Sequence, residues 1–356
     1  MLNALAAKFR RAGSVETLRD EGKRALERGE YAQALRLIEK AVRDEPNDAD
    51  AVFHAGQAAL RLGAHRKALA HFERCIALVP SSADAYCYAG FAKLGLGDSA
   101  RARVYCEDAF ARDPHHVENH NLLAALTLPG PSYPEVLAAL HRTLTPRTYV
   151  EIGVEAGRSL APVLPSTRVV GIDPAPELES QTPPNVRIFG LSSDEYFATR
   201  DLCADLEGLP VDLGFIDGSH LFEQALRDFI NLERAATPHS TILIHDTYPL
   251  TMLSAERERR TGFWSGDVWR LVLVLKKFRP ELNVANVATA PTGLCIVRGL
   301  DPASGVLAGN YDAIVAELLR VEYPVLDSDK PGLLNLFPND LERVLDLVRI
   351  PTSTPA

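Results

Sequence analysis

Two aspartates and a histidine in the second half of the chain have a spacing that suits a metal site with a general base. Asp217 follows the apolar run 213–216, Asp246 follows the run 242–245, and His220 lies three residues beyond Asp217. If the two runs are neighbouring parallel strands, both carboxylates point into one crevice beyond the strand ends. Paired carboxylates suit a hard divalent cation such as magnesium, and an imidazole can remove a hydroxyl proton near neutral pH. The pattern predicts a metal site at Asp217 and Asp246 with His220 as the general base.

The same residues also have structural interpretations. Aspartates at strand ends can cap the turn or helix that follows, and His220 can be an ordinary residue of a helix start. His245 precedes Asp246 on its strand. Because neighbouring residues of a strand alternate between faces, we expect His245 to point away from Asp246 and to have a packing role.

A glycine-containing segment at 149–159 indicates a nucleoside pocket. Gly153 permits a sharp turn and close approach of the backbone to a ligand, and Gly157 is expected to open the next helix. Asp173 ends the next apolar run, where a carboxylate suits the hydroxyls of a ribose. The loop reads GxxxG rather than GxGxxG, which favours S-adenosylmethionine, a cofactor without a pyrophosphate, over a nicotinamide dinucleotide. Glu151 can accept from its ammonium group, so we expect Glu151, Gly153, Gly157, Ser159 and Asp173 to hold this cofactor.

The elements that would position these residues alternate between strands and helices. Short apolar runs bounded by Gly, Pro, Asp or Ser predict strands at 148–153, 168–172, 186–189, 211–216, 241–245, 282–287 and 294–297. This alternation predicts a mostly parallel sheet covered on both faces, closed by a hairpin between the last two strands. We expect a domain at 129–300 that begins with a helix at 134–144. Amphipathic stretches at 311–322 and 339–350 predict that residues 301–356 add helices to it.

A repeat with a period of 34 residues occupies the first third of the chain. Glycine recurs at positions 22, 56 and 90 and again at 29, 63 and 97, alanine at 34, 68 and 102, and proline at 46, 80 and 114. The first glycine column lets paired helices approach closely, and the second suits the turn between them. A single unit cannot bury its own apolar face. We therefore expect an α-solenoid of three units over 15–116, a capping helix at 117–128 and a helix or arm at 1–14.

These patterns resemble two known families. The repeat resembles the tetratricopeptide repeat, which implies a groove for a protein partner or for self-association. The Glu151–Gly157 pattern with Asp173 resembles class I S-adenosylmethionine-dependent methyltransferases, which implies a Rossmann-like domain with seven strands. Residues 148–298 resemble the metal-dependent catechol-type O-methyltransferases, and more closely a bacterial branch that methylates sugar hydroxyls of natural products.

The resemblance assigns roles to individual residues. It implies that Asp217 and Asp246 bind the metal, with Asp217 also beside the cofactor, and that His220 is the base where the catechol enzymes have lysine. It also implies that Ser192 and Asp194, which follow the third strand, contact the adenine edge. A Ser or Asp after a strand is equally an ordinary turn signal.

One position departs from the family pattern. The residue after the metal-binding aspartate of the fifth strand is commonly Asn or Asp, whereas Thr247 follows Asp246 here. A hydroxyl is a weaker ligand than a carboxylate, so water or Asp267 would complete the metal shell, or the enzyme uses no metal. The segment 264–270 also recurs in the bacterial branch, where the preceding loop covers the substrate. Trp264 and Trp269 are expected to pack in the core or in this lid.

The composition argues against several classes of protein. The net charge is -9, and no sustained basic stripe is present to follow a nucleic-acid backbone. No apolar run approaches the ~20 residues that a membrane span needs. Five cysteines without CxxC spacing argue against a disulfide framework and a zinc site. We expect a cytoplasmic protein.

Together these features predict an S-adenosylmethionine-dependent O-methyltransferase that acts on a small-molecule hydroxyl, a sugar or other natural product, with magnesium assistance. In one alternative, the repeats recruit a protein or carrier-bound substrate. In another, the chain is a non-catalytic interaction protein whose methyltransferase fold only senses the cofactor.

Overall fold

The computed structural model describes residues 16–349, and the chain divides into two compact units, Met1–Thr127 and Leu128–Ala356. The arm expected at 1–14 and the last residue of the helix expected at 339–350 lie outside the described residues.

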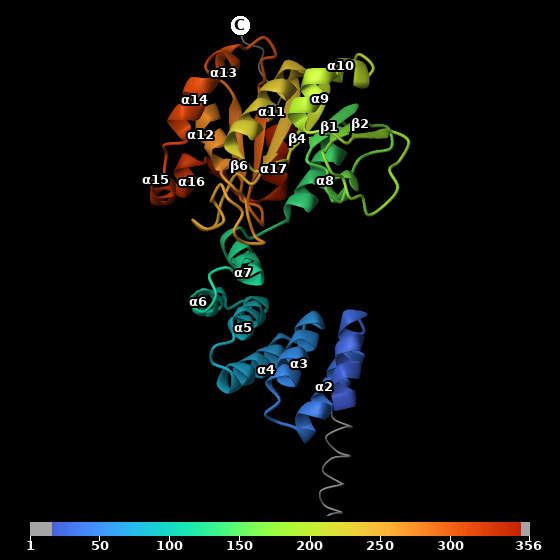
Figure 1. Ribbon diagram of the computed structural model, residues 1–356, viewed down its shortest axis with the longest axis vertical. Helices are drawn as coiled ribbons and strands as arrows, with labels where there is room; N and C mark the ends of the chain where they lie inside the picture. Colours follow the sequence, from blue (N-terminus) through green and yellow to red (C-terminus); the bar gives the residue numbers. More distant parts are fainter. Residues whose placement is uncertain (1–15, 350–356) are drawn as a thin grey trace, which may run out of the picture. The chain divides into compact units, whose positions relative to one another are not determined.

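The first unit is a series of antiparallel helix pairs (Figure 1). After helical residues 16–27 come α2 (Tyr31–Asp44), α3 (Ala49–Arg61), α4 (His65–Leu78), α5 (Ala83–Gly95), α6 (Ser99–Phe110) and α7 (Val117–Thr127). The turn glycines Gly29, Gly63 and Gly97 have φ of 77°, 71° and 78°, a region that glycine enters without strain. The period of 34 residues therefore marks successive helix pairs, with α7 as the cap.

The other glycine column marks the contact between paired helices. A Cβ at Gly56 would lie 2.6 Å from Cε1 of Phe72, and a Cβ at Gly22 would clash with the Ile38 side chain. At Gly90 the clash would be with Leu122 of the capping helix α7. Close packing of this kind leaves no room for an added methyl group. The small residues are thus required by the large side chains that face them.

The second unit is built on one eight-stranded sheet in the order β3-β2-β1-β4-β5-β7-β6-β8. Its strands are β1 (Thr148–Ile152), β2 (Arg168–Ile172), β3 (Val186–Phe189), β4 (Val211–Ile216), β5 (Ala236–His245), β6 (Asn283–Val287), β7 (Leu294–Arg298) and β8 (Leu336–Phe337). The first five are parallel, and β7 runs antiparallel to β5 and β6. The two-residue β8 adds one strand to the seven expected, and it pairs with β6 from the far C-terminal region.

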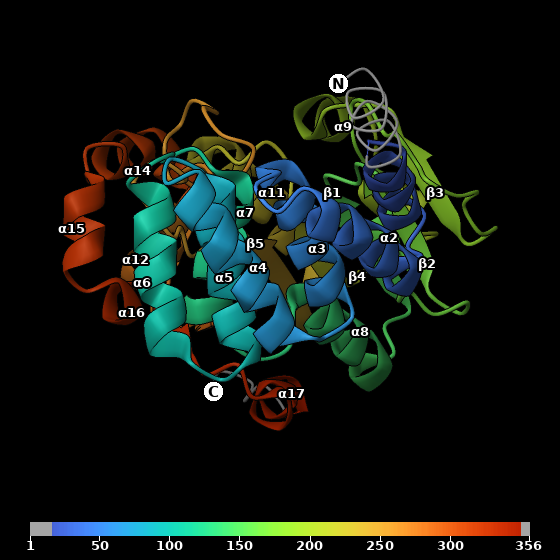
Figure 2. The ribbon, with the colours of Figure 1, turned by 90° about the horizontal axis from the view of Figure 1, so that it is seen from below.

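Helices cover both faces of this sheet. The helices α8 (Tyr133–Leu144) and α17 (Leu341–Arg349) lie side by side on one face (Figures 1 and 2). On the other face, α11 (Phe222–Arg234) brings Leu232 against Gly214 of β4. The remaining helices are α9 (Ser193–Thr199), α10 (Leu202–Asp205), α12 (Trp269–Phe278), α13 (Val306–Gly309), α14 (Tyr311–Leu318), α15 (Tyr323–Ser328) and α16 (Lys330–Leu333).

The expectation that Gly157 opens an α-helix is wrong. Only a single 3-10 turn, Arg158–Leu160, follows it. Two prolines, Pro162 and Pro165, explain the difference, because proline lacks an amide hydrogen and disfavours helical backbone in the residue before it. The crossover from β1 to β2 is therefore a loop, and α8 covers the sheet in this region.

Candidate functional site

A cavity of about 560 Å³ lies at the carboxyl ends of β1, β4 and β5. Five of the residues predicted from the sequence line it, namely Gly153, Ser159, Asp217, His220 and Asp246. Its other walls come from Tyr133, Arg158, Arg259, Phe263, Trp264 and Thr292, among others. The volume is in the range of pockets that bind small molecules. One cavity is therefore lined by most of the glycine loop, residues 153–159, and by the three residues Asp217, His220 and Asp246, which we call the acid–histidine group.

Asp217, His220 and Asp246 form a compact group in this cavity. His220 Nε2 lies 3.1 Å from Asp246 Oδ2 and 3.7 Å from Asp217 Oδ1. One ligand atom from each residue fits within a 4.8 Å span, so the three could share a metal ion. His220 and Asp246 have φ of 56° and 59°, which non-glycine residues rarely adopt and which is enriched at functional sites.

The interpretation of His245 as a residue pointing away from this group is wrong. Its Nδ1 lies 3.1 Å from Asp217 Oδ1 and 3.4 Å from Asp246 Oδ2. The left-handed backbone of Asp246 breaks the alternation of faces at the strand end, so both side chains reach the same place. Burial alone would lower the pKa of His245, but the two carboxylates outweigh it and hold that pKa well above its usual value.

The hydroxyl group beside Asp246 comes from Thr292 and not from Thr247, the next residue in the sequence. Thr292, from the loop between β6 and β7, donates its hydroxyl to Asp246 Oδ1 at 2.6 Å. Thr247 is buried and instead donates to Asn286 Oδ1 at 2.9 Å, so it takes no part in the acid–histidine group. Sequence reasoning missed Thr292, although the predicted hairpin beside the fifth strand was a usable signal.

His220 is held from its other side by Trp264. The two rings stack with centroids 5.0 Å apart and planes 22° apart, and His220 Nδ1 lies 3.2 Å from the Trp264 carbonyl oxygen. A carbonyl oxygen only accepts, so Nδ1 carries the hydrogen. His220 Nε2 is then the nitrogen that faces Asp246. Trp264 thus packs on the site itself, whereas Trp269 is fully buried in α12.

Behind the glycine loop, Glu151 is a fully buried carboxyl group on β1. The Ser159 hydroxyl donates to its Oε1, and the buried Tyr149 hydroxyl is the other polar neighbour of the carboxyl group. Burial raises the pKa of Glu151 to about 8. Glu151 does not line the cavity itself, but a cationic ammonium group that approached it would favour its ionised form. The residues present therefore fit the ammonium end of S-adenosylmethionine.

Gly153 is required by close contact between two strand ends. Its φ is 88°, and an added Cβ would clash with the backbone carbonyl oxygen of Asp217. Any larger residue would push β4 away from β1 at the cavity floor. Gly157 has φ of 74° and lies beside Leu178, outside the cavity.

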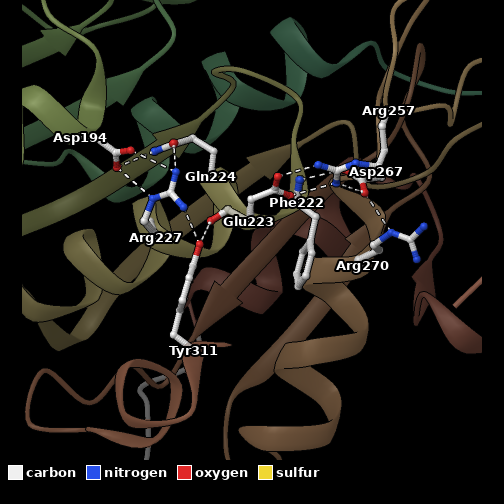
Figure 3. Close-up of polar contacts among 9 residues, drawn as sticks. All are labelled: Asp194, Phe222, Glu223, Gln224, Arg227, Arg257, Asp267, Arg270 and Tyr311. Carbon is white, nitrogen blue, oxygen red and sulfur yellow. Dashed lines mark hydrogen bonds and ion pairs between the residues drawn. The ribbon is translucent and has the colours of Figure 1, made fainter. Parts of the chain in front are cut away.

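Five predicted cofactor residues do not line the cavity, namely Glu151, Gly157, Asp173, Ser192 and Asp194. Asp173 accepts from the amides of Val154 and Glu155 at 2.9 and 2.8 Å, and so fixes the loop after β1. Ser192 caps α9, where its hydroxyl accepts from a backbone amide. Asp194 forms an ion pair with Arg227 of α11 at 3.0 Å (Figure 3). Their predicted contacts with ribose and adenine remain predictions.

The expectation that Asp267 could complete a metal shell is wrong. Asp267 is fully buried, and its Oδ2 is held by Arg257 at 2.6 Å and by Arg270 at 3.0 Å (Figure 3). Its Oδ1 accepts from the amide of Phe222. Both oxygens are therefore committed to partners outside the acid–histidine group.

Comparison with known families agrees with this geometry. Residues 150–247 match a family model described as a methyltransferase domain, and residues 19–83 match one described as a tetratricopeptide repeat. The chain carries an S-adenosylmethionine-dependent methyltransferase domain behind tetratricopeptide repeats. The matched part of the methyltransferase domain contains the glycine loop and the whole acid–histidine group.

Several solved structures are similar to the repeat unit. The first tetratricopeptide-repeat domain of Spaghetti (RPAP3), bound to an HSP90 peptide, is 22% identical with a TM-score of 0.31, covering 32% of this chain and 90% of that one. The Arabidopsis OM64 repeat domain is 16% identical with a TM-score of 0.32, covering 33% and 96%. MamA is 25% identical with a TM-score of 0.31, covering 32% and 66%. No curated protein matches the chain. Among residues 16–349, no helix has both the length and the apolar character needed to cross a bilayer.

Proposed function

We propose that the methyltransferase domain methylates a hydroxyl group of a small molecule, such as a sugar or another natural product. The observation that carries the proposal is the single cavity in which Gly153 and Ser159 of the cofactor loop face Asp217, His220 and Asp246. Methyl transfer needs a donor and an acceptor oxygen held in line, with a base beside the oxygen. The aromatic side chains of Tyr133, Phe263 and Trp264 on the walls suit a ring-shaped acceptor.

In this proposal His220 Nε2 accepts the hydroxyl proton. The hydrogen bond from Nδ1 to the Trp264 carbonyl leaves Nε2 as the accepting nitrogen of the neutral ring. Asp246, 3.1 Å from Nε2, stabilises the imidazolium that forms. The acceptor oxygen forms its new bond to carbon as the O–H bond breaks. When bound, S-adenosylmethionine supplies that methyl carbon and is converted to S-adenosylhomocysteine.

We propose that Asp217 and Asp246 would hold a divalent cation such as magnesium. Its charge would favour the ionised form of the acceptor hydroxyl. Support comes from the two carboxylates, whose oxygens lie within 4.8 Å of one another, and His220, as the base, is not a ligand in this proposal. The hydrogen bond from Thr292 orients the Asp246 carboxylate toward this place.

Three measurements test the proposal. Calorimetry should detect binding of S-adenosylmethionine to the purified protein, and absence of binding would overturn the proposal. Methyl-labelled cofactor should transfer label to members of a panel of glycosides and catechols, and His220→Ala should lose this transfer while the exposed-histidine control His239→Ala keeps it. Label that appears only in protein would instead favour a protein acceptor. Activity that survives treatment with a chelator would contradict a role for the cation and would leave the proposed methyl transfer with His220 as the base.

We further propose that the repeat unit binds a protein partner or a second copy of the chain. Support comes from a cavity of about 180 Å³ lined by Leu26, Tyr31, Leu60 and Tyr88, among others. The catalytic unit is proposed to span 129–300, with 301–356 as its helical extension. A cytoplasmic location is proposed because all five cysteines are free thiols. Pull-down of the protein with and without residues 1–127, followed by mass spectrometry, tests the role of the repeats.

A further inference from the structure

The helix that follows His220 has no capping residue of its own. α11 begins at Phe222, and its N-cap residue, Leu221, has no side chain that can accept a hydrogen bond. The acceptor comes instead from 45 residues further along the chain, because the amide of Phe222 donates to Asp267 Oδ1 at 2.8 Å. An acid at a helix start also interacts favourably with the helix dipole. Asp267 therefore replaces a cap that the local sequence does not provide.

The same segment also fixes the backbone of His220 itself. The Asp267 amide donates to the His220 carbonyl oxygen at 3.2 Å. Gly266, with φ of 59°, lies so close that an added Cβ would clash with that oxygen. His220 has a left-handed backbone, a strained conformation that persists only where the surrounding structure over-determines it. The contacts from Gly266 and Asp267 are surroundings of this kind.

Asp267 is in turn held rigidly. Its carboxylate is fully buried between Arg257 and Arg270, and Arg270 also donates to the Leu318 carbonyl oxygen at 2.7 Å. Arg257 extends the network to Glu223 of α11, at 2.9 Å (Figure 3). Two arginines around one carboxylate satisfy the buried charge and leave it no freedom to turn. Figure 3 shows this network continuing through Glu223 to Tyr311 and Arg227.

We propose that Asp267 is a positioning residue for His220. It fixes the left-handed turn at His220 and the first turn of α11, and thereby aims the imidazole Nε2 at Asp217 and Asp246. Asp267 does not line the cavity, and it reaches the acid–histidine group only through the backbone of His220 and the first turn of α11. The consequence for catalysis rests on the proposed function, whereas the consequence for the placement of His220 does not.

Trp264 provides a readout of this placement that needs no acceptor substrate. The chain has two tryptophans, and Trp264 is the one whose ring stacks on His220. In a Trp269→Phe background, the fluorescence of Trp264 and its quenching by acrylamide report whether the stack is intact. His220→Ala in this background defines the signal of the unstacked ring. If His220→Ala has the same Trp264 fluorescence and quenching as the parent Trp269→Phe protein, the two rings are not stacked and the proposal is overturned.

The test compares Asp267→Ala with the control Tyr311→Phe, which removes a hydroxyl at the other end of the same network. The signal of Asp267→Ala should move toward that of His220→Ala, and Tyr311→Phe should keep the parent signal. If Asp267→Ala fails to fold, Asp267→Asn serves, because the amide oxygen can still accept from Phe222 while the charge is lost. Asp267→Asn should then show an intermediate signal. A parent-like signal in every Asp267 variant that folds would overturn the proposal.

The catalytic consequence is measured separately. With an acceptor found by the label-transfer screen, Asp267→Ala should lower kcat by about 100-fold, the loss expected from misplacing a catalytic group by ~1 Å. The Kd for S-adenosylmethionine should stay within about twofold, because Asp267 does not line the cavity. Asp267→Asn should recover part of kcat. Unchanged kcat with a disturbed Trp264 signal would contradict His220 as the base and leave Asp267 as its positioning residue.

Discussion

The buried Glu151 carboxyl group makes a quantitative prediction about stability. Its pKa of about 8 in the folded protein compares with an ordinary value of 4.5. A carboxyl group whose folded-state pKa is raised keeps its proton on folding, so its cost to stability is absent below pH 4.5 and grows as pH rises toward 8. The full difference of 3.5 units corresponds to about 5 kcal/mol at 1.36 kcal/mol per unit. Between pH 5 and pH 8 the loss should be about 3–4 kcal/mol.

The assay compares the parent protein with Glu151→Gln, which keeps the shape of the side chain and cannot ionise. Denaturant unfolding followed by tryptophan fluorescence reports on the second unit, since both tryptophans, Trp264 and Trp269, lie there. The difference between the two profiles of unfolding free energy against pH removes the contributions of the other titratable groups, which both proteins share. The difference should favour Glu151→Gln increasingly from pH 5 to pH 8. Parallel profiles over this range would refute the reasoning that Glu151 is protonated in the folded protein.

Cofactor binding should reverse this cost. An ammonium group beside Glu151 Oε2 stabilises the carboxylate, so binding below pH 8 should release a proton, and affinity should rise by up to about tenfold per pH unit as pH approaches 8. Calorimetry in buffers of different ionisation heat counts the proton. Glu151→Gln should bind more weakly and without proton release, and proton release that persists in this variant would assign the effect to another group.

The remaining predictions concern the base, the cation and the repeats. His220→Ala should lower kcat by about 10²–10⁴-fold with little change in the Kd of S-adenosylmethionine, and calorimetry with kinetics separates the two effects. Asp246→Asn should weaken Mn²⁺ binding measured by electron paramagnetic resonance, whereas Thr247→Val should keep it, and equal losses would contradict the geometry. Gly56→Ala should destabilise the repeat unit by about 1–3 kcal/mol because its Cβ would lie 2.6 Å from Phe72, and circular dichroism melting of a 1–127 fragment compared with the full chain detects the loss.

Much of the fold could be predicted because periodic signals survive in a single sequence. The 34-residue columns indicated the helix pairs, and the apolar runs placed six strands at nearly their observed bounds, whereas β5 begins at Ala236, five residues before its predicted start. The 3-10 turn after Gly157 was predictable in principle, since Pro162 and Pro165 were visible. The strand β8 was not, because two residues carry no period and pair only through tertiary contact.

The site residues that directly follow parallel strands could be predicted. Those whose placement depends on backbone conformation or on a distant loop were missed. The sequence placed Asp217, His220 and Asp246 together because parallel strands end at one edge. It misplaced His245, since no local pattern reveals a left-handed Asp246. It missed Thr292, which lies 46 residues from the aspartate it contacts.

The cavity draws its floor and its walls from different stretches of the chain. The acid–histidine group and the cofactor loop lie within residues 150–247, which the methyltransferase family model matches, whereas Tyr133, Arg259, Phe263, Trp264 and Thr292 lie outside it. Substitution of Arg259 or Phe263 can therefore change which molecule is admitted, whereas Trp264 and Thr292 also hold His220 and Asp246 in place. In this architecture, residues that select the acceptor can therefore change while the residues that carry out methyl transfer stay the same. Relatives that share an acceptor should be sought by comparing the residues that correspond to Arg259 and Phe263.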